Sequence, residues 1–320
     1  MKKNIVILGP LGQDGKLLSS ILDKDNYNVF GVCKENTNSE RIKFHEENFN
    51  TKIFCIDLVS YEKTKELLDS ILPDIIVNFC GITNVFNPWE DMDLIFKQNC
   101  TIPLNIMEYI SKNNKDIFFF QSSSSLIYGR SEKNHIGHFS NFSPIYPYGI
   151  TKLYTHNFLN EYRKNFNLKC SSGIFFNHES QYRGDNFLTK KVANFISKVL
   201  KGEKGVLKLG DLSSKRDVSH AIDFMYGVKH IIDNELNDDF IFSSGKLTST
   251  KELVELFFSK YGLDMNNFVV QDETLKRKDD ICIYGDDTKL QLTGWRPKKN
   301  LNDLVVDMVE FELNNDNFIY

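Results

Sequence analysis

The amino-acid sequence predicts an α/β protein with a doubly wound parallel sheet and a smaller, mostly helical C-terminal domain. Over the first half of the chain, short runs of β-branched and aromatic residues alternate with longer amphipathic stretches. A glycine-rich turn follows the first of these runs, and the alternation changes after residues 177–180. The 320 residues, 41% of them hydrophobic, are enough to bury a large core.

Six apolar runs have the length of buried strands. Strands covered by helices on both faces are buried on both sides, so they read as nearly continuous apolar segments. Amphipathic stretches between them, such as 61–72 and 151–166, predict the crossover helices. The predicted strands are residues 4–9, 28–33, 53–57, 74–80, 116–122 and 169–176.

The later segments predict a second domain that covers one edge of this sheet. Ligands of open α/β sheets bind beyond the carboxyl ends of the strands, so we expect this domain to lie over that edge. We assign residues 1–179 to the first domain, rejoined by 215–246, and residues 180–214 and 247–320 to the second. The predicted elements are a helix at 186–201, a strand at 206–210, a helix from Val218 to Ile232, a strand at 239–245, and mostly helix thereafter.

Composition and charge exclude several classes of partner. The net charge is −4, the pI is about 6.0 and the charges are scattered, which does not favour nucleic acid. No apolar run approaches the length of a membrane span, and the N-terminus does not read as a signal sequence. We therefore expect no membrane partner and a cytoplasmic location. The six widely spaced cysteines predict buried free thiols rather than disulfides or a metal site.

The segment GPLGQDG at residues 9–15 predicts a dinucleotide-binding turn of the Rossmann type. Its three glycines suit a tight turn, close approach of the backbone to a pyrophosphate, and close packing of helix on strand. The helix that begins here would hold the anion at its N-terminus. A purely structural turn is the alternative, but the position after the first strand favours cofactor binding. The residues predicted to contact the cofactor here are Gly9, Gly12, Gln13, Asp14 and Gly15.

The end of the second strand bears on the choice between NAD and NADP. Dinucleotide sites usually have an acidic residue there for the ribose of NAD, or an arginine for the phosphate of NADP. Here Cys33 occupies the usual acidic position, Lys34 can meet a phosphate, and Glu35 repels one. We predict NAD, with NADP as the alternative. Asp57 and Leu58, at the end of the third strand, are predicted to contact the adenine end.

Tyr148 and Lys152 lie four residues apart at the start of a predicted helix and therefore share one face. A lysine ammonium near a phenol favours the phenolate, so we expect Lys152 to lower the pKa of Tyr148. Tyr148 can then take the proton of a substrate hydroxyl while hydride leaves the same carbon. Ser124, after the fifth strand, is predicted to hold that hydroxyl, and Lys152 also to reach the nicotinamide ribose. Such pairs occur at ordinary surface helix starts too, but here a glycine turn and a serine-rich strand end precede it.

Together these motifs resemble the extended short-chain dehydrogenase/reductase superfamily of nucleotide-sugar enzymes over nearly the whole chain. Three segments are similar to the GDP-mannose 4,6-dehydratases: FNHES at 176–180, RDVSHA at 216–221 and GWRP at 294–297. The resemblance implies a GDP-sugar substrate, an NAD(P) cofactor, a second domain that binds the nucleotide sugar, and a homodimer or homotetramer. The residues that it implies for substrate binding are Asn177, Arg183, Arg216, Arg277 and Asp280.

Chemistry independently supports the arginines of this set, because a guanidinium group can form paired hydrogen bonds with the oxygens of a pyrophosphate in a closed site. The alternative for Arg216 is a pair with Asp217 at a solvated helix start. His178 is expected to be a structural histidine rather than a metal ligand, since no metal-type cluster accompanies it.

One residue departs from the pattern of the dehydratases. Their loop carries a carboxylate two residues after the catalytic hydroxyl, and Leu126 stands at that place. A second acid usual in the following loop aligns with His138. The carboxylate is the base that removes the proton from carbon 5 of the sugar. Without it, elimination should be slower by about 10²–10⁴, while hydride transfer through Ser124, Tyr148 and Lys152 remains.

We therefore expect a GDP-sugar 4-dehydrogenase or 4-ketoreductase. The first alternative is a 4,6-dehydratase that recruits another base, such as His138. The second is a 4-epimerase, because four serines before an apolar residue also occur in that branch. A different class is a non-catalytic protein that senses nucleotides or acts as a scaffold. The intact set Ser124, Tyr148 and Lys152 argues against it.

Overall fold

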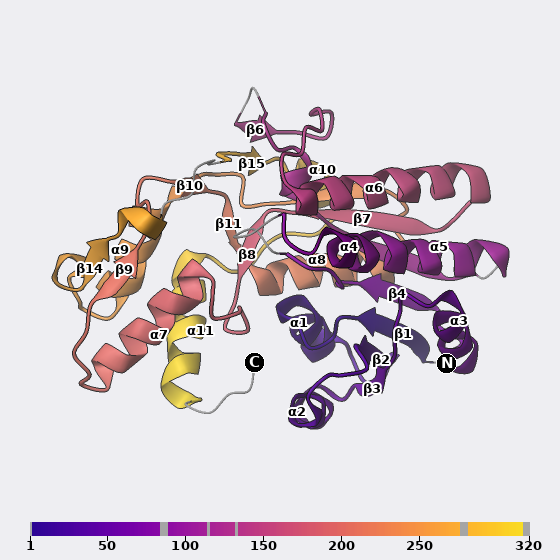
Figure 1. The fold of residues 1–320 in the computed structure, drawn as a ribbon, viewed down its shortest axis with the longest axis horizontal. Helices are drawn as coiled ribbons and strands as arrows, with labels where there is room; N and C mark the ends of the chain where they lie inside the picture. Colours follow the sequence, from indigo (N-terminus) through magenta and orange to yellow (C-terminus); the bar gives the residue numbers. More distant parts are fainter. Residues whose placement is uncertain (1, 84–88, 114–115, 132–133, 276–280, 316–320) are drawn as a thin grey trace.

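The structure, a computed structural model, describes residues 2–83, 89–113, 116–131, 134–275 and 281–315. At its centre lies a seven-stranded parallel sheet with the order β12-β7-β5-β4-β1-β2-β3 (Figure 1). The chain runs outward from β1 to β3, then crosses back and continues from β4 to β12, which confirms the doubly wound arrangement. The strands are β1 (Lys3–Leu8), β2 (Tyr27–Cys33), β3 (Lys52–Cys55), β4 (Ile75–Asn78), β5 (Phe118–Ser124), β7 (Cys170–Phe175) and β12 (Asp239–Phe242).

Alternate residues of each strand supply the cores on the two faces of the sheet. Ile5 and Ile7 pack toward α1 and α8, whereas Val6 and Leu8 pack toward α3, α5 and α6. All four side chains are fully buried, and burial of one such side chain stabilises the fold by about 1.5–3 kcal/mol. The helices are α1 (Gln13–Ile21) and α8 (Ala221–Asp233) on one face, and α3 (Tyr61–Ile71), α5 (Ile102–Lys112) and α6 (Pro147–Phe166) on the other.

A further core lies away from the sheet, among helices α7 (Leu188–Leu200), α9 (Thr250–Lys260) and α11 (Leu301–Asn314). Figure 1 shows these helices beside the sheet rather than against either of its faces. This group agrees with the mostly helical second part that the sequence predicts, while the residue boundaries of the two domains stay a prediction. The short pair β9 (Leu207–Leu209) and β14 (Val269–Gln271) lies at its edge.

The remaining elements are short and lie mainly at the edges of these layers. Helix α2 lies next to the outer strand β3 (Figure 1). The remaining helical elements are α2 (Ser39–Phe49), α4 (Met92–Phe96), a π-helix (Lys97–Thr101), 3₁₀ turns at Ser125–Ile127, Met265–Asn267 and Glu273–Leu275, and α10 (Thr288–Leu292). Two short strand pairs are β6 (His135–Ile136) with β15 (Tyr284–Gly285), and β10 (Lys215–Arg216) with β13 (Thr248–Ser249).

The predicted start of a helix at Val218 is wrong. Residues Val218–His220 form strand β11, which pairs in parallel with β8 (Asn177–Glu179), and α8 begins only at Ala221. The imidazole of His220 accepts a hydrogen bond from the backbone N–H of Ile222 and so caps the helix one turn later than predicted. This pairing brings the segments 176–180 and 216–221 side by side.

All six cysteines are free, as predicted, but only Cys100 and Cys170 are buried. The others lie at strand ends and loops, where Cys33 and Cys55 of neighbouring strands have their sulfur atoms 3.2 Å apart. Among the residues that the structure describes, no helix combines the length and apolar character needed to cross a membrane.

Candidate active site

The turn between β1 and α1 has the geometry of an anion-binding cradle. Gly9 has φ +83°, a conformation that favours glycine, and a Cβ on Gly15 would lie 2.4 Å from the Gly9 carbonyl oxygen. At Gly12 a Cβ would meet only that oxygen, at 3.5 Å, so the backbone there is open to a ligand. No side chain of the described residues caps the first N–H groups of α1, which are thus available to a phosphate. These features fit the diphosphate of a dinucleotide.

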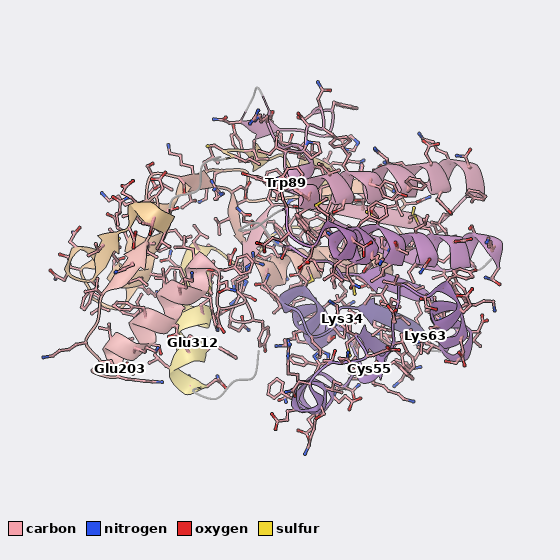
Figure 2. The ribbon with its side chains drawn as sticks, viewed as in Figure 1. Lys34, Cys55, Lys63, Trp89, Glu203 and Glu312 are labelled. Atoms are coloured by element: carbon pink, nitrogen blue, oxygen red, sulfur yellow. The ribbon has the colours of Figure 1, made fainter. Side chains whose placement is uncertain are left out.

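The residues predicted for the adenine end lie at the ends of β2 and β3, apart from the main pocket. Lys34 is exposed at the end of β2 (Figure 2). Glu35 beside it forms an ion pair with Lys63, with 2.5 Å between Oε1 and Nζ. The Asp57 carboxylate accepts a hydrogen bond from the backbone N–H of Val59 at 3.0 Å. Leu58 is buried against the sheet. Ligand contacts of these residues, and NAD with NADP as the alternative, stay predictions.

Ser124 ends β5, and Tyr148 begins α6 beside it. The helix can lie this close because residue 149 is glycine: a Cβ there would lie 2.5 Å from the carbonyl oxygen of Leu126. Burial raises the pKa of Tyr148 to about 12, although a hydrogen bond with Ser124 acts in the opposite direction. The tyrosine and the serine predicted to act on one hydroxyl therefore lie within hydrogen-bonding reach of each other.

Lys152 is directed at the strand end rather than at the phenol. Its ammonium donates a hydrogen bond to the carbonyl oxygen of Ser122 at 2.9 Å and lies 5.7 Å from the centre of the Tyr148 ring. Burial lowers the pKa of Lys152 to about 8. Burial is the largest cause of the raised pKa of Tyr148, and the expectation that Lys152 favours the phenolate stays a prediction.

A cavity of about 480 Å³ brings the predicted catalytic and substrate residues together. Its size is within the range of small-molecule sites. It lies where the carboxyl ends of the central strands face the second part of the chain. Predicted residues that line it are Asp14, Ser124, Tyr148, Lys152, Asn177, Arg183 and Arg216. Arg277 and Asp280 lie outside the described residues.

Two cations that line this cavity, Lys191 and Lys208, were not predicted from the sequence. Lys191 lies in the first turn of α7 and Lys208 on β9. The signal for Lys191 was available, since two adjacent lysines follow Arg183 at the start of a predicted helix. Lys208 carried no such signal, because its place depends on how β9 packs beside the cavity.

Asn99 was not predicted from the sequence either. It does not line the cavity, but it contacts two segments that do. It lies in the π-helical turn, a local irregularity that is frequent at functional sites. Its amide accepts a hydrogen bond from the N–H of Ile82 at 2.7 Å and donates one to the Thr151 hydroxyl at 3.0 Å. Asn99 thereby links the segment after β4 to the helix that carries Lys152.

His178 connects the cofactor turn to strand β8. Its Nε2 lies 3.0 Å from an oxygen of Asp14, and its Nδ1 lies 2.8 Å from the carbonyl oxygen of Phe176. Burial lowers the pKa of His178, but the charge and hydrogen bond of Asp14 outweigh this, so its pKa is raised overall. Next to this pair, Arg183 lies 3.1 Å from Glu179.

A family model for GDP-mannose 4,6 dehydratase matches residues 6–308. The chain belongs to the GDP-mannose 4,6-dehydratase family. It is 28% identical over 326 residues to GDP-mannose 4,6 dehydratase 1 of Arabidopsis thaliana, covering 98% of this chain and 90% of that protein.

Solved structures share the fold of this family member. RMD from Pseudomonas aeruginosa complexed with NADPH has a TM-score of 0.81 and 19% identity, covering 98% of this chain and 100% of that one. The dTDP-glucose 4,6-dehydratase from Bacillus anthracis in complex with NAD has a TM-score of 0.83 and 17% identity, covering 98% and 97%. The chain is thus an NAD(P)-dependent epimerase/dehydratase-type enzyme that acts on nucleotide sugars.

In this family member Leu126 lies near Ser124, the predicted catalytic hydroxyl, and lines the same cavity. His138, the other candidate base, is exposed and does not line the cavity; its Nε2 lies 3.2 Å from the ammonium of Lys289. Within the described residues, the carboxylates of the cavity lining already have partners. Asp14 meets His178, Glu179 meets Arg183 and the hydroxyl of Thr189, and Asp211 accepts from Ser213.

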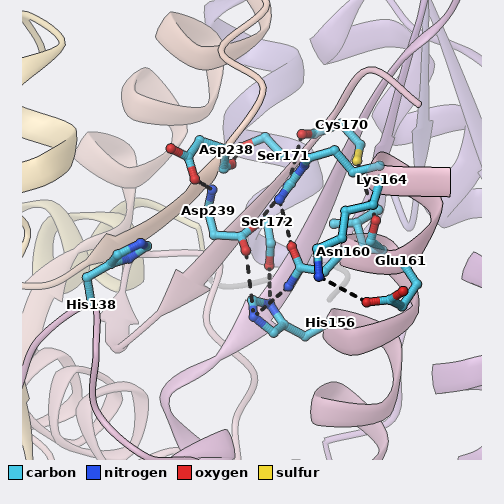
Figure 3. A network of polar contacts seen from close by, with 12 residues as sticks. His138, His156, Asn160, Glu161, Lys164, Cys170, Ser171, Ser172, Asp238 and Asp239 are labelled. Carbon is cyan, nitrogen blue, oxygen red and sulfur yellow. Dashed lines mark hydrogen bonds and ion pairs between the residues drawn. The ribbon is translucent and has the colours of Figure 1, made fainter. Parts of the chain in front are cut away.

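Figure 3 shows a separate polar network around His156, with His138 apart from it. His156 lies 3.2 Å from the Ser172 hydroxyl and 3.7 Å from Asp239, which Arg163 meets at 2.7 Å. The serine is fully buried, so this Ser-His-Asp set is not a nucleophilic triad of the hydrolase kind. It ties α6, which carries Tyr148 and Lys152, to β7 and β12. The described residues contain no group of three or more His, Cys, Asp or Glu that could hold a metal ion.

Proposed function

We propose that this protein transfers hydride at carbon 4 of a GDP-sugar, as a 4-dehydrogenase or a 4-ketoreductase, without eliminating water. The observation that carries the proposal is Leu126, an apolar side chain beside Ser124 and Tyr148 where a dehydratase needs a base. The exposed position of His138 and the engaged carboxylates of the cavity support the same conclusion.

In the oxidation, three residues act on the carbon-4 hydroxyl. Ser124 holds the hydroxyl, Tyr148 accepts its proton, and the carbon–oxygen bond becomes a carbonyl as hydride leaves carbon 4. When bound, oxidised NAD(P) accepts that hydride and brings a positive charge into the site. The Lys152 ammonium, 5.7 Å from the centre of the Tyr148 ring, would favour the phenolate. In the reduction the same residues act in the reverse order.

The substrate class rests on the family and on the cations of the cavity. The matching family model and the relative from Arabidopsis thaliana are named for GDP-mannose. Arg183, Arg216, Lys191 and Lys208 line the side of the cavity formed by the second part of the chain. Four cations suit a nucleoside diphosphate, and Arg183 and Arg216 can bind it through paired hydrogen bonds.

Two alternatives use the same hydride machinery. A 4,6-dehydratase would also need a base for carbon 5. A 4-epimerase would need only a rotation of the 4-keto sugar between oxidation and reduction. The fold supports neither over the other, and Leu126 weighs against the dehydratase.

The experiment is to incubate purified protein with NAD or NADP and a panel of GDP-sugars, with UDP-glucose and dTDP-glucose as controls. Nicotinamide absorbance and product mass are followed. We expect a product lighter by two hydrogens together with reduced cofactor, or the reverse with a 4-keto sugar. Tyr148→Phe should fold normally and lose hydride transfer by about 10²-fold or more. Loss of water, altered stereochemistry at unchanged mass, or full activity of Tyr148→Phe would each contradict the proposal.

We also propose that the chain forms a homodimer through α4 and α6. Phe96 and Phe158 are exposed and join Tyr154 in one aromatic patch, with ring centres 5.6 Å and 4.6 Å apart. Exposed apolar patches of this kind mark association surfaces. The family resemblance implies dimers through helices that flank Tyr148 and Lys152, and a tetramer is the alternative.

A further inference from the structure

Asp14 presents a carboxylate where the enzyme must bind a negatively charged ligand. It is the second residue of α1, whose N-terminus forms the anion cradle with Gly9 and Gly12, and it lines the cavity that holds Tyr148 and Lys152. Its charge reaches both of these catalytic groups. A dinucleotide brings two phosphate charges to the same helix terminus, so an uncompensated carboxylate here would weaken its binding.

His178 cancels this charge by its hydrogen-bond geometry. The carbonyl oxygen of Phe176 can only accept a hydrogen bond, so Nδ1 of His178, 2.8 Å away, must carry a proton. Nε2, at 3.0 Å and 3.2 Å from the two oxygens of Asp14, then either donates to an ionised carboxylate or accepts from a protonated one. The first arrangement is an ion pair and the second is a neutral pair. In both, Asp14 and His178 together carry no net charge.

We propose that His178 is a charge-compensating residue of the dinucleotide site, which allows Asp14 to remain at the helix terminus without repelling the diphosphate. The histidine comes from β8, which directly follows β7, and lies 164 residues from Asp14 in the chain. The cofactor site of the first domain is therefore completed electrostatically by the segment that also carries Asn177 toward the substrate cavity.

The contact between α1 and β8 does not depend on this pair alone. The Gln13 amide donates to the carbonyl oxygen of His178 at 3.1 Å and accepts from the Ser180 hydroxyl at 2.9 Å. The ring of His178 also stacks on Phe224 with centres 5.0 Å apart. A change of charge at position 14 or 178 can therefore be tested while the two elements stay joined.

The test measures dissociation constants of NAD and NADP by calorimetry for His178→Gln, Asp14→Asn and the double variant. His178→Gln leaves the charge of Asp14 uncompensated and should weaken binding about tenfold. Asp14→Asn added to His178→Gln removes that charge and should restore most of the loss. His220→Gln is the matched control, because His220 also lies 3.0 Å from an aspartate, Asp307, but outside the cavity lining.

The outcomes separate charge compensation from a structural role. If the double variant binds as weakly as His178→Gln or more weakly, although thermal melting shows it folded, the proposal is wrong. Equal losses in His178→Gln and His220→Gln would also overturn it. The test uses no sugar substrate, so its result does not depend on whether the enzyme is a dehydrogenase, a dehydratase or an epimerase.

Discussion

At residue 126 the chain has a side chain that cannot move a proton, next to Ser124 and Tyr148, which can. Hydride transfer at carbon 4 needs only the hydroxyl and the phenol, while removal of the proton at carbon 5 needs a further base. The two steps use different residues, so loss of one residue can remove one step and leave the other. We therefore propose that the reaction outcome in this family member depends on position 126.

We predict that Leu126→Glu restores part of the elimination. Carbon 4 is oxidised by the native residues, and the ketone acidifies the proton on carbon 5, which the new carboxylate must then reach. The gain should be partial, because a carboxyl in an apolar setting has a raised pKa and lacks neighbours that orient it. The measurement is water loss from a GDP-sugar by mass spectrometry. Leu126→Gln, which has a similar shape but cannot act as a base, is the control and should show none.

Among the elements, the position of helix α6 depends on residue 149 being glycine, which has no Cβ. A side chain at position 149 would collide with the backbone of Leu126, and backbone cannot move aside as a flexible side chain can. The position of Tyr148 relative to Ser124 therefore depends on Gly149.

We predict that Gly149→Ala lowers hydride transfer by about 10²-fold while the protein remains folded, because the start of α6 must shift away from the serine turn. The matched control is Gly137→Ala, since a Cβ at Gly137 meets no described atom within 4 Å. Activity is measured by cofactor reduction, and folding by circular dichroism. Equal activity of the two variants would contradict the role given to Gly149.

Helix α2 contains a buried histidine that should make the fold acid-sensitive. His45 is fully buried, and neither ring nitrogen has a hydrogen-bond partner among the described residues. Burial, with the charge of Lys16, lowers its pKa from 6.5 to about 4. The unfolded chain then binds this proton more readily than the folded chain, so stability is present above pH 6.5 and is lost as pH falls toward 4.

We predict that this loss amounts to on the order of 3 kcal/mol in the free energy of unfolding, and that His45→Phe removes it. Urea unfolding at pH 7 and pH 4.5 measures the difference. The exposed His138→Phe is the control. A native protein and a His45→Phe protein with the same pH dependence would show that His45 is not the responsible group.

The sequence predicted the sheet because its strands are buried on both faces. Runs such as Phe118–Phe120 have no polar interruption, and their length distinguishes them from helices. Strand β11 was not predicted, because its partner β8 lies about 40 residues away and the pairing has no local signal. The candidate catalytic residues were predicted from local motifs, whereas the contact of Asp14 with His178 depends on the tertiary fold.

In the whole molecule, the sheet with its covering helices carries the glycine turn and the candidate catalytic residues. The cations that line the same cavity come from a loop (Arg183), α7 (Lys191), β9 (Lys208) and β10 (Arg216). The outer surface of α4 and α6 remains exposed in the single chain, with Phe96 47% and Phe158 37% exposed. Because Tyr148 lies in the first turn of α6, an interface on this helix would help to hold the candidate catalytic end in place.

We predict that the native protein is a dimer and that Phe158→Glu makes it a monomer, since a charge in the centre of an apolar interface loses its solvation. Light scattering after size-exclusion chromatography measures the mass. Phe139→Glu is the control, because Phe139 is 95% exposed and lies outside this patch. A native monomer, or a Phe158→Glu protein of unchanged dimeric mass, would contradict the assigned interface.

The central claim is that the native enzyme changes carbon 4 and leaves carbon 5 untouched. The most direct measurement is incubation of native protein with NAD(P) and a GDP-hexose in deuterium oxide, followed by mass spectrometry of the recovered sugar nucleotide. We predict a product that differs by two hydrogens, with no deuterium at carbon 5 and no loss of water. Rapid uptake of deuterium at carbon 5 together with loss of water would contradict it and would make the enzyme a 4,6-dehydratase with a base other than residue 126.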